Sequence, residues 1–267
     1  LQRRSDLTGR NTIIYYSGWL QKPDLAAPLT SITDADKSGF MMAVHNLDPS
    51  KGLDLVLHTP GGETAATESI VDYLRQKFGT DIRAVVPQLA MSGGTMVACA
   101  CRSILMGRQS SLGPIDPQLG GLPAHGIMEE FEQARREIAQ NPASIPLWQP
   151  IIAHYRPTLI GECQKSIAWA DEMVSEWLRS GMFSGEADAE DRARVVLEGL
   201  GDHALTKSHA RHLSAQKCIR LGMKVEMMED SPQAVGVQPP QGNGAGGEVT
   251  VTFLSDVLID DELGEPV

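Results

Sequence analysis

The chain has 267 residues, of which 42% are hydrophobic and 21% are charged. These values are near the averages of soluble globular proteins, so they exclude a mainly disordered or collagen-like chain. The net charge is −11, yet residues 1–224 are nearly neutral and carry no basic stripe, which argues against nucleic acid as the main ligand.

The first half of the sequence alternates short apolar runs with longer segments of helical spacing. Strands are expected where the runs are short, apolar and rich in β-branched residues, at residues 12–16, 53–58, 82–87 and 103–106. Helices are expected where apolar or small residues follow a helical period, at residues 33–47, 64–78 and 92–100. This alternation predicts an α/β sheet of largely parallel strands flanked by helices.

The second half reads as charged amphipathic helices. They are expected at residues 127–140, 158–179 and 188–200, and residues 209–229 hold one more helix and a short strand. The second of these helices carries one apolar stripe, formed by Cys163, Ile167, Ala170, Val174 and Trp177. Because such a stripe must bury against another surface, it favours an association with further copies of the chain.

The last segment differs in composition from the rest. From Ser231 onward Pro, Gln, Gly and Asn dominate, and residues 225–267 hold nine acidic and no basic residues. We therefore expect a folded domain over residues 1–230 and a flexible linker with an acidic C-terminal tail over residues 231–267. The tail fits either a solvated segment or one that binds a partner protein.

Cysteines and histidines give no sign of a metal or a cofactor. Cys99 and Cys101 form a Cys-x-Cys pair without a second pair at zinc-ligand spacing, so buried reduced thiols are expected, as in a reducing compartment. The histidines, His125 among them, are scattered and form no His-x-x-x-His pair. No metal and no cofactor are expected.

Two glycine-rich turns stand out at the ends of expected strands. Residues 59–62 read Thr-Pro-Gly-Gly, and residues 90–94 read Ala-Met-Ser-Gly-Gly, the layout of a nucleophile elbow around Ser92. The amide of Gly93 and that of Gly62 would then supply the oxyanion hole. Each turn alone has a plainer interpretation, since a serine before two glycines is often only a helix N-cap.

Together with residues 111–118, Ser-Leu-Gly-Pro-Ile-Asp-Pro-Gln, these turns resemble the ClpP and signal-peptide-peptidase class of serine proteases. Within that class the chain most resembles the serine dehydrogenase proteinases, over roughly residues 10–230. The resemblance implies a ClpP/crotonase-like α/β fold, Ser92 as nucleophile, and Gly62 and Gly93 as oxyanion hole. It also implies hydrolysis of peptide bonds without a metal, and assembly into a homo-oligomer.

The general base is less well defined. Asp116 stands where ClpP-type enzymes place a histidine, and it is expected to brace a turn or a backbone donor instead. Signal-peptide peptidases use a lysine made neutral by burial, and the only lysine between Ser92 and Ser180 is Lys165. However, Lys165 lies off the apolar stripe of its own helix, so His209 and Lys207 remain alternative bases.

The sequence therefore predicts a serine endopeptidase of Ser–Lys type that acts on polypeptides. The alternative is an inactive or acyl-CoA-type crotonase-like module that serves binding or assembly, because fold alone does not decide function. The first residues are polar and do not form a signal peptide. A cytoplasmic location is expected, with membrane association if a longer precursor carries an N-terminal anchor.

Overall fold

The computed structural model describes residues 2–201 and 211–230. Its centre is a five-stranded sheet in the order β1 (Asn11–Tyr16), β2 (Leu53–His58), β3 (Ile82–Val86), β5 (Ser103–Met106) and β10 (Val225–Met227). Every neighbouring pair in this sheet is parallel, and β2 is buried along its whole length. The predicted α/β architecture is thus confirmed.

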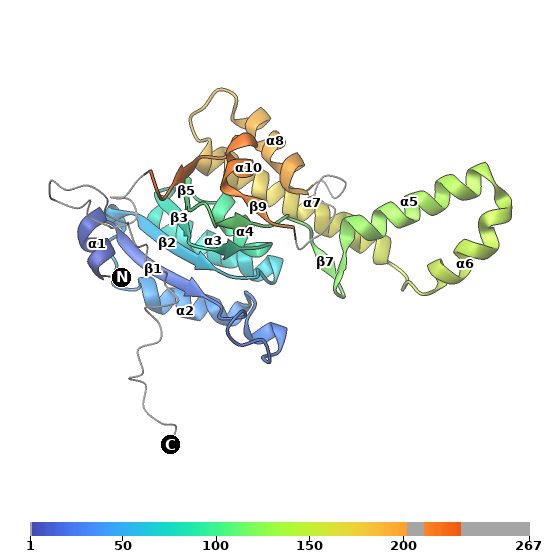
Figure 1. Ribbon diagram of the computed structural model, residues 1–267, viewed down its shortest axis with the longest axis horizontal. Coiled ribbons are helices and arrows are strands. Elements are labelled where there is room, and N and C mark those ends of the chain that lie inside the picture. Colours follow the sequence, from blue (N-terminus) through green and yellow to red (C-terminus); the bar gives the residue numbers. More distant parts are fainter. Residues whose placement is uncertain (1, 202–210, 231–267) are drawn as a thin grey trace, which may run out of the picture.

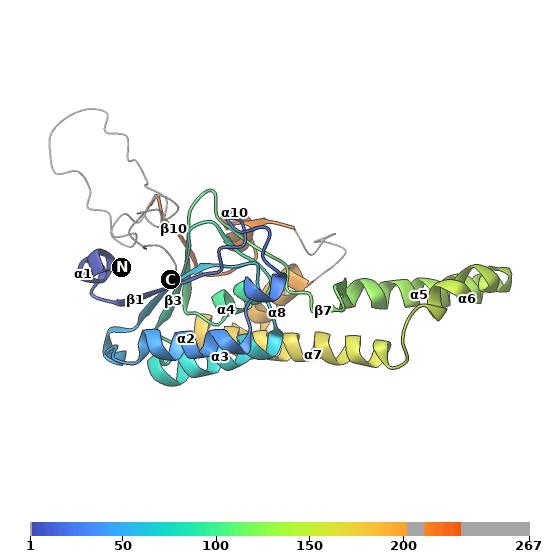
Figure 2. The ribbon, with the colours of Figure 1, turned by 90° about the horizontal axis from the view of Figure 1, so that it is seen from below.

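The helices lie mostly on one side of the sheet. They are α1 (Gln2–Thr8), α2 (Asp34–Val44), α3 (Thr64–Phe78), α4 (Gly93–Cys99), α5 (Ala124–Gln140), α6 (Ile145–Ala153), α7 (Leu159–Trp177), α8 (Ala189–Gly201) and α10 (Ala215–Arg220). Figure 2 shows α2, α3 and α7 below the sheet, whereas α5 and α6 project away from it as an arm (Figure 1). The sequence did not predict α1 or α6, and its expected helix near residue 209 begins at Ala215.

Three short pairings lie beyond the main sheet. Strands β4 (Leu89–Ala90), β6 (Ser111–Leu112) and β9 (Leu213–Ser214) form a three-stranded sheet. Strands β7 (Gln118–Leu119) and β8 (Leu122–Pro123) form an antiparallel hairpin that leads directly into α5. The described residues also contain three 3₁₀ turns (Ala27–Leu29, Pro49–Lys51 and Pro142–Ser144) and a π-helical turn (Leu178–Met182). The hairpin matters below because it brings the start of α5 back to the sheet edge.

The core explains the composition of two helices. All seven residues of α4 are buried, which is why they are small or apolar. On α7 the residues Ala170, Val174 and Trp177 join the main core. Cys163 and Ile167 belong to a second cluster between α5 and α7. The apolar stripe of α7 is therefore buried, as expected, but within one chain. It gives no reason of its own to expect a second copy, and the homo-oligomer stays a prediction.

The cysteines, the C-terminal segment and possible membrane spans are the remaining features that the sequence analysis addressed. All four cysteines are free and buried, as expected. Residues 231–267, the predicted linker and acidic tail, lie outside the described residues, so the proposed domain boundary stays a prediction. Within the described residues, no helix is both long and apolar enough to cross a bilayer.

Candidate active site

The two glycine-rich turns lie side by side at the carboxyl edge of the sheet. A bridge between Thr59 and Ala90 aligns them. The Thr59 N–H donates to the Leu89 carbonyl over 3.1 Å, and the Met91 N–H donates to the Thr59 carbonyl over 2.9 Å. Ligands bind at this edge in open α/β sheets, because the loops after parallel strands meet there.

Ser92 has a strained backbone at the entry to α4. Its φ is 48° and its ψ is −114°, which is unfavourable for a residue with a Cβ. Gly61, with φ of 98°, packs so closely that a Cβ on it would lie 2.7 Å from the Ser92 Cβ. The neighbouring turn thus needs glycine to approach the serine. Such strain at a strand–helix turn is typical of a nucleophile elbow.

The Ser92 hydroxyl is not used as a helix cap. Ser92 precedes α4, yet its side chain accepts no capping hydrogen bond. Within residues 2–201 and 211–230, no group forms a hydrogen bond with its Oγ. The plainer interpretation of Ser92 as an N-cap is therefore not supported, and the hydroxyl is available for another role.

The amides of Gly62 and Gly93 are close together, and neither forms a hydrogen bond within residues 2–201 and 211–230. A Cβ on Gly93 would lie 3.3 Å from the Gly62 nitrogen. Ile32 pairs with the flanking groups, donating to the Gly61 carbonyl and accepting from the Glu63 N–H, which leaves the Gly62 N–H without an acceptor in the described part of the chain. Gly93 opens α4, and the first N–H groups of a helix have no intrahelical acceptor. Two free amides beside a serine form the geometry of an oxyanion hole.

Thr95 anchors the loop that follows β6 to the back of the elbow. Its buried hydroxyl lies 2.9 Å from the Ala90 carbonyl and accepts a 2.9 Å hydrogen bond from the Gly113 N–H. This contact fixes the course of residues 113–117 next to Ser92. It therefore brings Asp116 to the same edge of the sheet.

A pocket of about 420 Å³ opens between these segments. Ser92, Gly61, Gly62 and Asp116 all line it, together with Gln118 and with Ala27, Pro28, Ser31, Ile32 and Thr33. Its ionisable lining groups are two carboxylates, Glu63 and Asp116, and within the described residues it has no Lys, Arg or His. The pocket is thus negatively charged around the serine.

Asp116 is paired with a histidine that the sequence did not single out. The Nδ1 of His125 lies 2.8 Å from Asp116 Oδ1, and the His125 N–H approaches the same oxygen at 3.4 Å. This hydrogen bond, together with the charges of Asp116, Asp171 and Glu129, outweighs burial and raises the pKa of His125. Asp116 thus braces a backbone donor, as expected. No local pattern in the sequence marks this contact, because it forms only when the hairpin that turns at Gly120 and Gly121 brings His125 back to Asp116.

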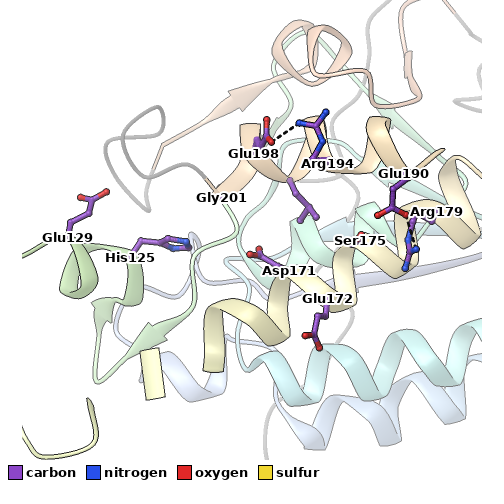
Figure 3. Close-up of a pocket in the computed structure, with 11 residues that line it drawn as sticks. His125, Glu129, Asp171, Glu172, Ser175, Arg179, Glu190, Arg194, Glu198 and Gly201 are labelled. Carbon is purple, nitrogen blue, oxygen red and sulfur yellow. Dashed lines mark hydrogen bonds and ion pairs between the residues drawn. The ribbon is translucent and has the colours of Figure 1, made fainter. Parts of the chain in front are cut away.

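His125 also lines a second, larger cavity of about 900 Å³. Figure 3 shows His125 directed into it from α5, with Asp171 on α7 across from it. Its two arginines are already paired, Arg179 with Glu190 and Arg194 with Glu198. Ser92 does not line this cavity, and His125 connects its lining to Asp116 of the Ser92 pocket.

The proposed bases are not brought to Ser92 within the described residues. Lys165 is exposed on α7, and it does not line the Ser92 pocket. Lys207 and His209 lie outside the described residues. The role of each as a base stays a prediction. The part of the chain that the structure describes also has no group of three His, Cys, Asp or Glu residues that would hold a metal ion.

Comparisons with known proteins place this arrangement in context. A sequence model of a family described as ClpP-like SDH-type serine proteinase matches residues 25–242. Two uncharacterized proteins of Methanocaldococcus jannaschii are similar in sequence. One is 29% identical over 212 residues, which are 78% of this chain and 66% of that protein. The other is 31% identical over 184 residues, which are 68% of this chain and 59% of that protein. The chain therefore spans less than two thirds of the length of both relatives.

Among solved structures, a mutant of the 1510-N membrane-bound stomatin-specific protease is similar to this chain. The match has a TM-score of 0.46 and 15% identity, and it covers 76% of this chain and 79% of that chain.

Proposed function

The chain belongs to the family of ClpP-like SDH-type serine proteinases, and we propose that it is a serine endopeptidase with Ser92 as its nucleophile. The observation that carries the proposal is the strained Ser92 beside two unused glycine amides. A serine that serves only to cap a helix has no need of this backbone strain, because N-caps adopt ordinary extended angles.

The proposed reaction follows from these groups. The Ser92 Oγ attacks the carbonyl carbon of a peptide bond while a base takes its proton. The resulting oxyanion lies between the Gly62 and Gly93 N–H groups, which stabilise it. The intermediate then collapses as the leaving amine receives the proton. Water then attacks the acyl carbon while the base takes its proton, and the Ser92 Oγ leaves and receives that proton, which releases the acid and restores the serine.

Lys165 is the first candidate for the base in a Ser–Lys mechanism, followed by Lys207 and His209. A lysine base must be neutral near the working pH, and that requires burial. Lys165 is exposed in the single chain. It therefore meets this requirement only if another copy of the chain covers it or if it acts in the site of a neighbouring copy.

The alternative function is an inactive or acyl-CoA-type crotonase-like module. An acyl-CoA enzyme uses two amides as an oxyanion hole but needs no serine hydroxyl between them. The free Ser92 Oγ and its strained backbone favour the protease. Within the described residues no Lys or His lines the Ser92 pocket, and this observation keeps an inactive assembly module as the second candidate.

Labelling with a fluorophosphonate probe tests the proposal. We expect the probe to react with the full chain and peptide mapping to locate it on Ser92. Ser92→Ala should lose both labelling and hydrolysis of a casein or peptide substrate. Gly93→Ala places a methyl group near the Gly62 nitrogen, so it should slow hydrolysis by roughly 10²- to 10³-fold.

Ser31→Ala is the matched control. Ser31 lines the same pocket, but its hydroxyl donates to the Ala27 carbonyl and belongs to no elbow. This variant should label and hydrolyse like the parent. A Ser92→Ala protein that cleaved peptides at the parental rate would remove the protease proposal, and an unlabelled but correctly folded parent would favour the assembly module.

A further inference from the structure

The Gly61–Gly62 turn needs support from neighbouring residues to keep one shape. Glycine has few restrictions on its backbone angles, so two glycines in a row do not by themselves define one conformation. The Gly62 N–H can stabilise an oxyanion only if it points steadily at the place where that oxygen forms. The contacts that hold this turn therefore decide how well the oxyanion hole is formed.

Ile32 holds the peptide group between Gly61 and Gly62. Its N–H donates to the Gly61 carbonyl over 2.8 Å. This peptide group is trans, so its carbonyl and its N–H point in opposite directions. The Gly62 N–H belongs to the same peptide group, and it therefore points away from Ile32.

Thr59 holds the preceding peptide group, between Pro60 and Gly61. Its Oγ1 accepts a 3.1 Å hydrogen bond from the Gly61 N–H, the contact of a turn in which a threonine hydroxyl binds the backbone two residues further on. The backbone of Gly61 lies at a φ of 98°, where no Cβ restricts it. Thr59 thus fixes the plane on the amino side of Gly61, while Ile32 fixes the plane on its carboxyl side. Together they set the direction of the Gly62 N–H.

Thr59 is itself held firmly. Its side chain is buried, at 0% exposure. The Ser17 hydroxyl, just after β1, donates to Thr59 Oγ1 over 3.0 Å. The methyl group packs against Gly94 of α4, where a Cβ would lie 2.6 Å from Thr59 Cγ2. The hydroxyl therefore serves the glycine turn, whereas the methyl group serves the packing on the elbow helix.

Resting on the proposed protease function, we propose that Thr59 is a positioning residue for the oxyanion hole. Its hydroxyl fixes the Gly61 amide and, through it, the direction from which the Gly62 N–H meets the oxyanion. Ser17 supports this role by holding the hydroxyl. The oxyanion exists only after Ser92 has attacked, so the role stabilises the transition state and not the bound substrate. Its loss therefore lowers kcat and leaves KM nearly unchanged.

Two substitutions of Thr59 separate the hydroxyl from the methyl group. Thr59→Val keeps the branched shape against Gly94 but removes the acceptor of the Gly61 N–H, whereas Thr59→Ser keeps the hydroxyl and removes the methyl group. Kinetics are measured on the full chain with a fluorogenic peptide that the parent hydrolyses. Thr59→Val should lower kcat by roughly 10- to 100-fold, the effect of a small misplacement in an active site, with KM within a few fold of the parent. Thr59→Ser should stay close to the parent in both constants.

A peptide aldehyde of the same sequence gives a second readout. It adds to the Ser92 Oγ and carries its own oxygen into the oxyanion hole, so it resembles the transition state. Its inhibition constant should rise in Thr59→Val by about the factor by which kcat/KM falls, and it should stay near the parental value in Thr59→Ser. Partial unfolding would lower the measured kcat but would not change the inhibition constant of the enzyme that remains folded.

Thr12→Val is the matched control. It makes the same change at a buried threonine of β1 whose hydroxyl has no hydrogen-bond partner among the described residues. This variant should keep the parental kcat and inhibition constant. Should Thr59→Val fail to fold, Ser17→Ala removes the donor to Thr59 at a partly exposed position. It should lower kcat several-fold without a change in KM, and a parental kcat would then overturn the proposal.

The outcomes separate this proposal from the protease function. A parent that hydrolyses the peptide, with a Thr59→Val variant that matches it in kcat, overturns the role of Thr59 and leaves the protease intact. A Thr59→Ser variant as slow as Thr59→Val also overturns it, since packing of the methyl group would then be responsible. A folded parent that neither labels with fluorophosphonate nor cleaves peptides contradicts the protease function itself.

Discussion

At the scale of single residues, the pair of Asp116 and His125 links protonation to the stability of the fold. The Asp116 carboxylate accepts from the imidazole, and this contact with the surrounding negative charge raises the pKa of His125 above its ordinary value. A group whose pKa is higher in the folded than in the unfolded state stabilises the fold when it is protonated. This stabilisation is complete below the unfolded pKa of about 6.5 and disappears as the pH rises through the folded pKa.

We therefore expect His125→Gln to destabilise the protein by about 1–2 kcal/mol at pH 6 and by less at pH 9. Glutamine keeps a hydrogen-bond donor but cannot become charged, so the variant removes the pH-dependent part of the stabilisation by His125. Urea unfolding at the two pH values, followed by circular dichroism, measures the difference. His154→Gln, at an exposed position after α6, should show little effect at either pH. An equal loss for His125→Gln at both pH values would contradict the charge-based explanation.

The residues of this site were not equally predictable. Ser92, Gly62 and Gly93 stand in short motifs after strands, where local turn chemistry sets their geometry, so the sequence indicated them. His125 contacts Asp116 only because the β7–β8 hairpin returns the chain to the sheet edge. That is a tertiary effect without a local pattern, so the histidine was taken as one of several scattered ones. The role of Lys165 was inferred by elimination among the lysines, and elimination says nothing about where the side chain lies relative to Ser92.

At the scale of elements, one buried carboxylate joins the amino-terminal ends of the strands. Asp54 of β2 is 0% exposed, and it accepts hydrogen bonds from Arg83 of β3 at 2.7 Å, from Arg10 at 2.8 Å and from Arg4 of α1 at 2.8 Å. Burial alone would raise the pKa of Asp54, but the hydrogen bonds and charges of these arginines outweigh it and hold the pKa below the usual range. The cluster lies at the end of the sheet opposite Ser92.

Asp54→Asn should destabilise the protein by about 3–5 kcal/mol, because it leaves buried arginines without their counter-charge. Asp81→Asn is the comparison. Asp81 pairs with Arg10 and Arg102 but is 39% exposed, so its loss should cost under about 1 kcal/mol. Urea denaturation at pH 7 measures both. A carboxyl group whose pKa is lower in the folded state stabilises the fold at pH values above its unfolded pKa, and this stabilisation is lost as the pH falls through the folded pKa. The difference in stability between Asp54→Asn and the parent should therefore vanish in acid. Similar losses for the two variants at pH 7 would rule out this role for the cluster.

Elements with a regular period were predictable from the sequence, and irregular ones were not. The first and last residues of β2 and α3 could be predicted from the apolar run of the strand and the helical spacing of the helix, because burial in the core requires both patterns. By contrast, α6 begins at Ile145, just before one proline, and contains a second at Pro150, which argues against a helix in sequence terms. The partners of Asp54 come from three separate segments, so no local pattern revealed them.

At the scale of the whole molecule, the arm carries apolar surface that the single chain leaves exposed. Leu147 is 71% exposed on α6, and Ile145 and Ile151 on the same helix are also exposed. The arm projects from the body in both views (Figures 1 and 2). Exposed apolar residues gathered on one short helix are typical of a protein–protein contact. This surface, and not the covered stripe of α7, is now the reason to expect a homo-oligomer.

We expect light scattering to give a mass above that of a dimer at micromolar concentration. Leu147→Glu should lower this mass with little change in the stability of the single chain, because the side chain is exposed. Gln149→Glu adds the same charge at an exposed polar position of α6 and should keep the parental mass. A parent that remains a monomer would contradict the expectation, and so would equal masses for the Leu147→Glu variant and the parent.

Oligomerisation also offers a direct test of the base, because an exposed Lys165 can act only if another copy completes its surroundings. Ser92→Ala and Lys165→Ala should each be inactive alone, since nucleophile and base work as a unit. If Lys165 serves the site of a neighbouring copy, mixing the two variants produces sites with an intact Ser92 from one chain and an intact Lys165 from the other. We expect such mixtures, after dissociation and reassembly, to hydrolyse peptides when neither variant does so alone.

The Lys165→Arg variant should behave like Lys165→Ala, both alone and in mixtures, because arginine stays protonated and cannot accept the serine proton. Full activity of Lys165→Ala on its own would remove Lys165 as the base and direct the same substitutions to Lys207 and His209. Activity lost in both variants and not restored by mixing would confine any role of Lys165 to the serine of its own chain.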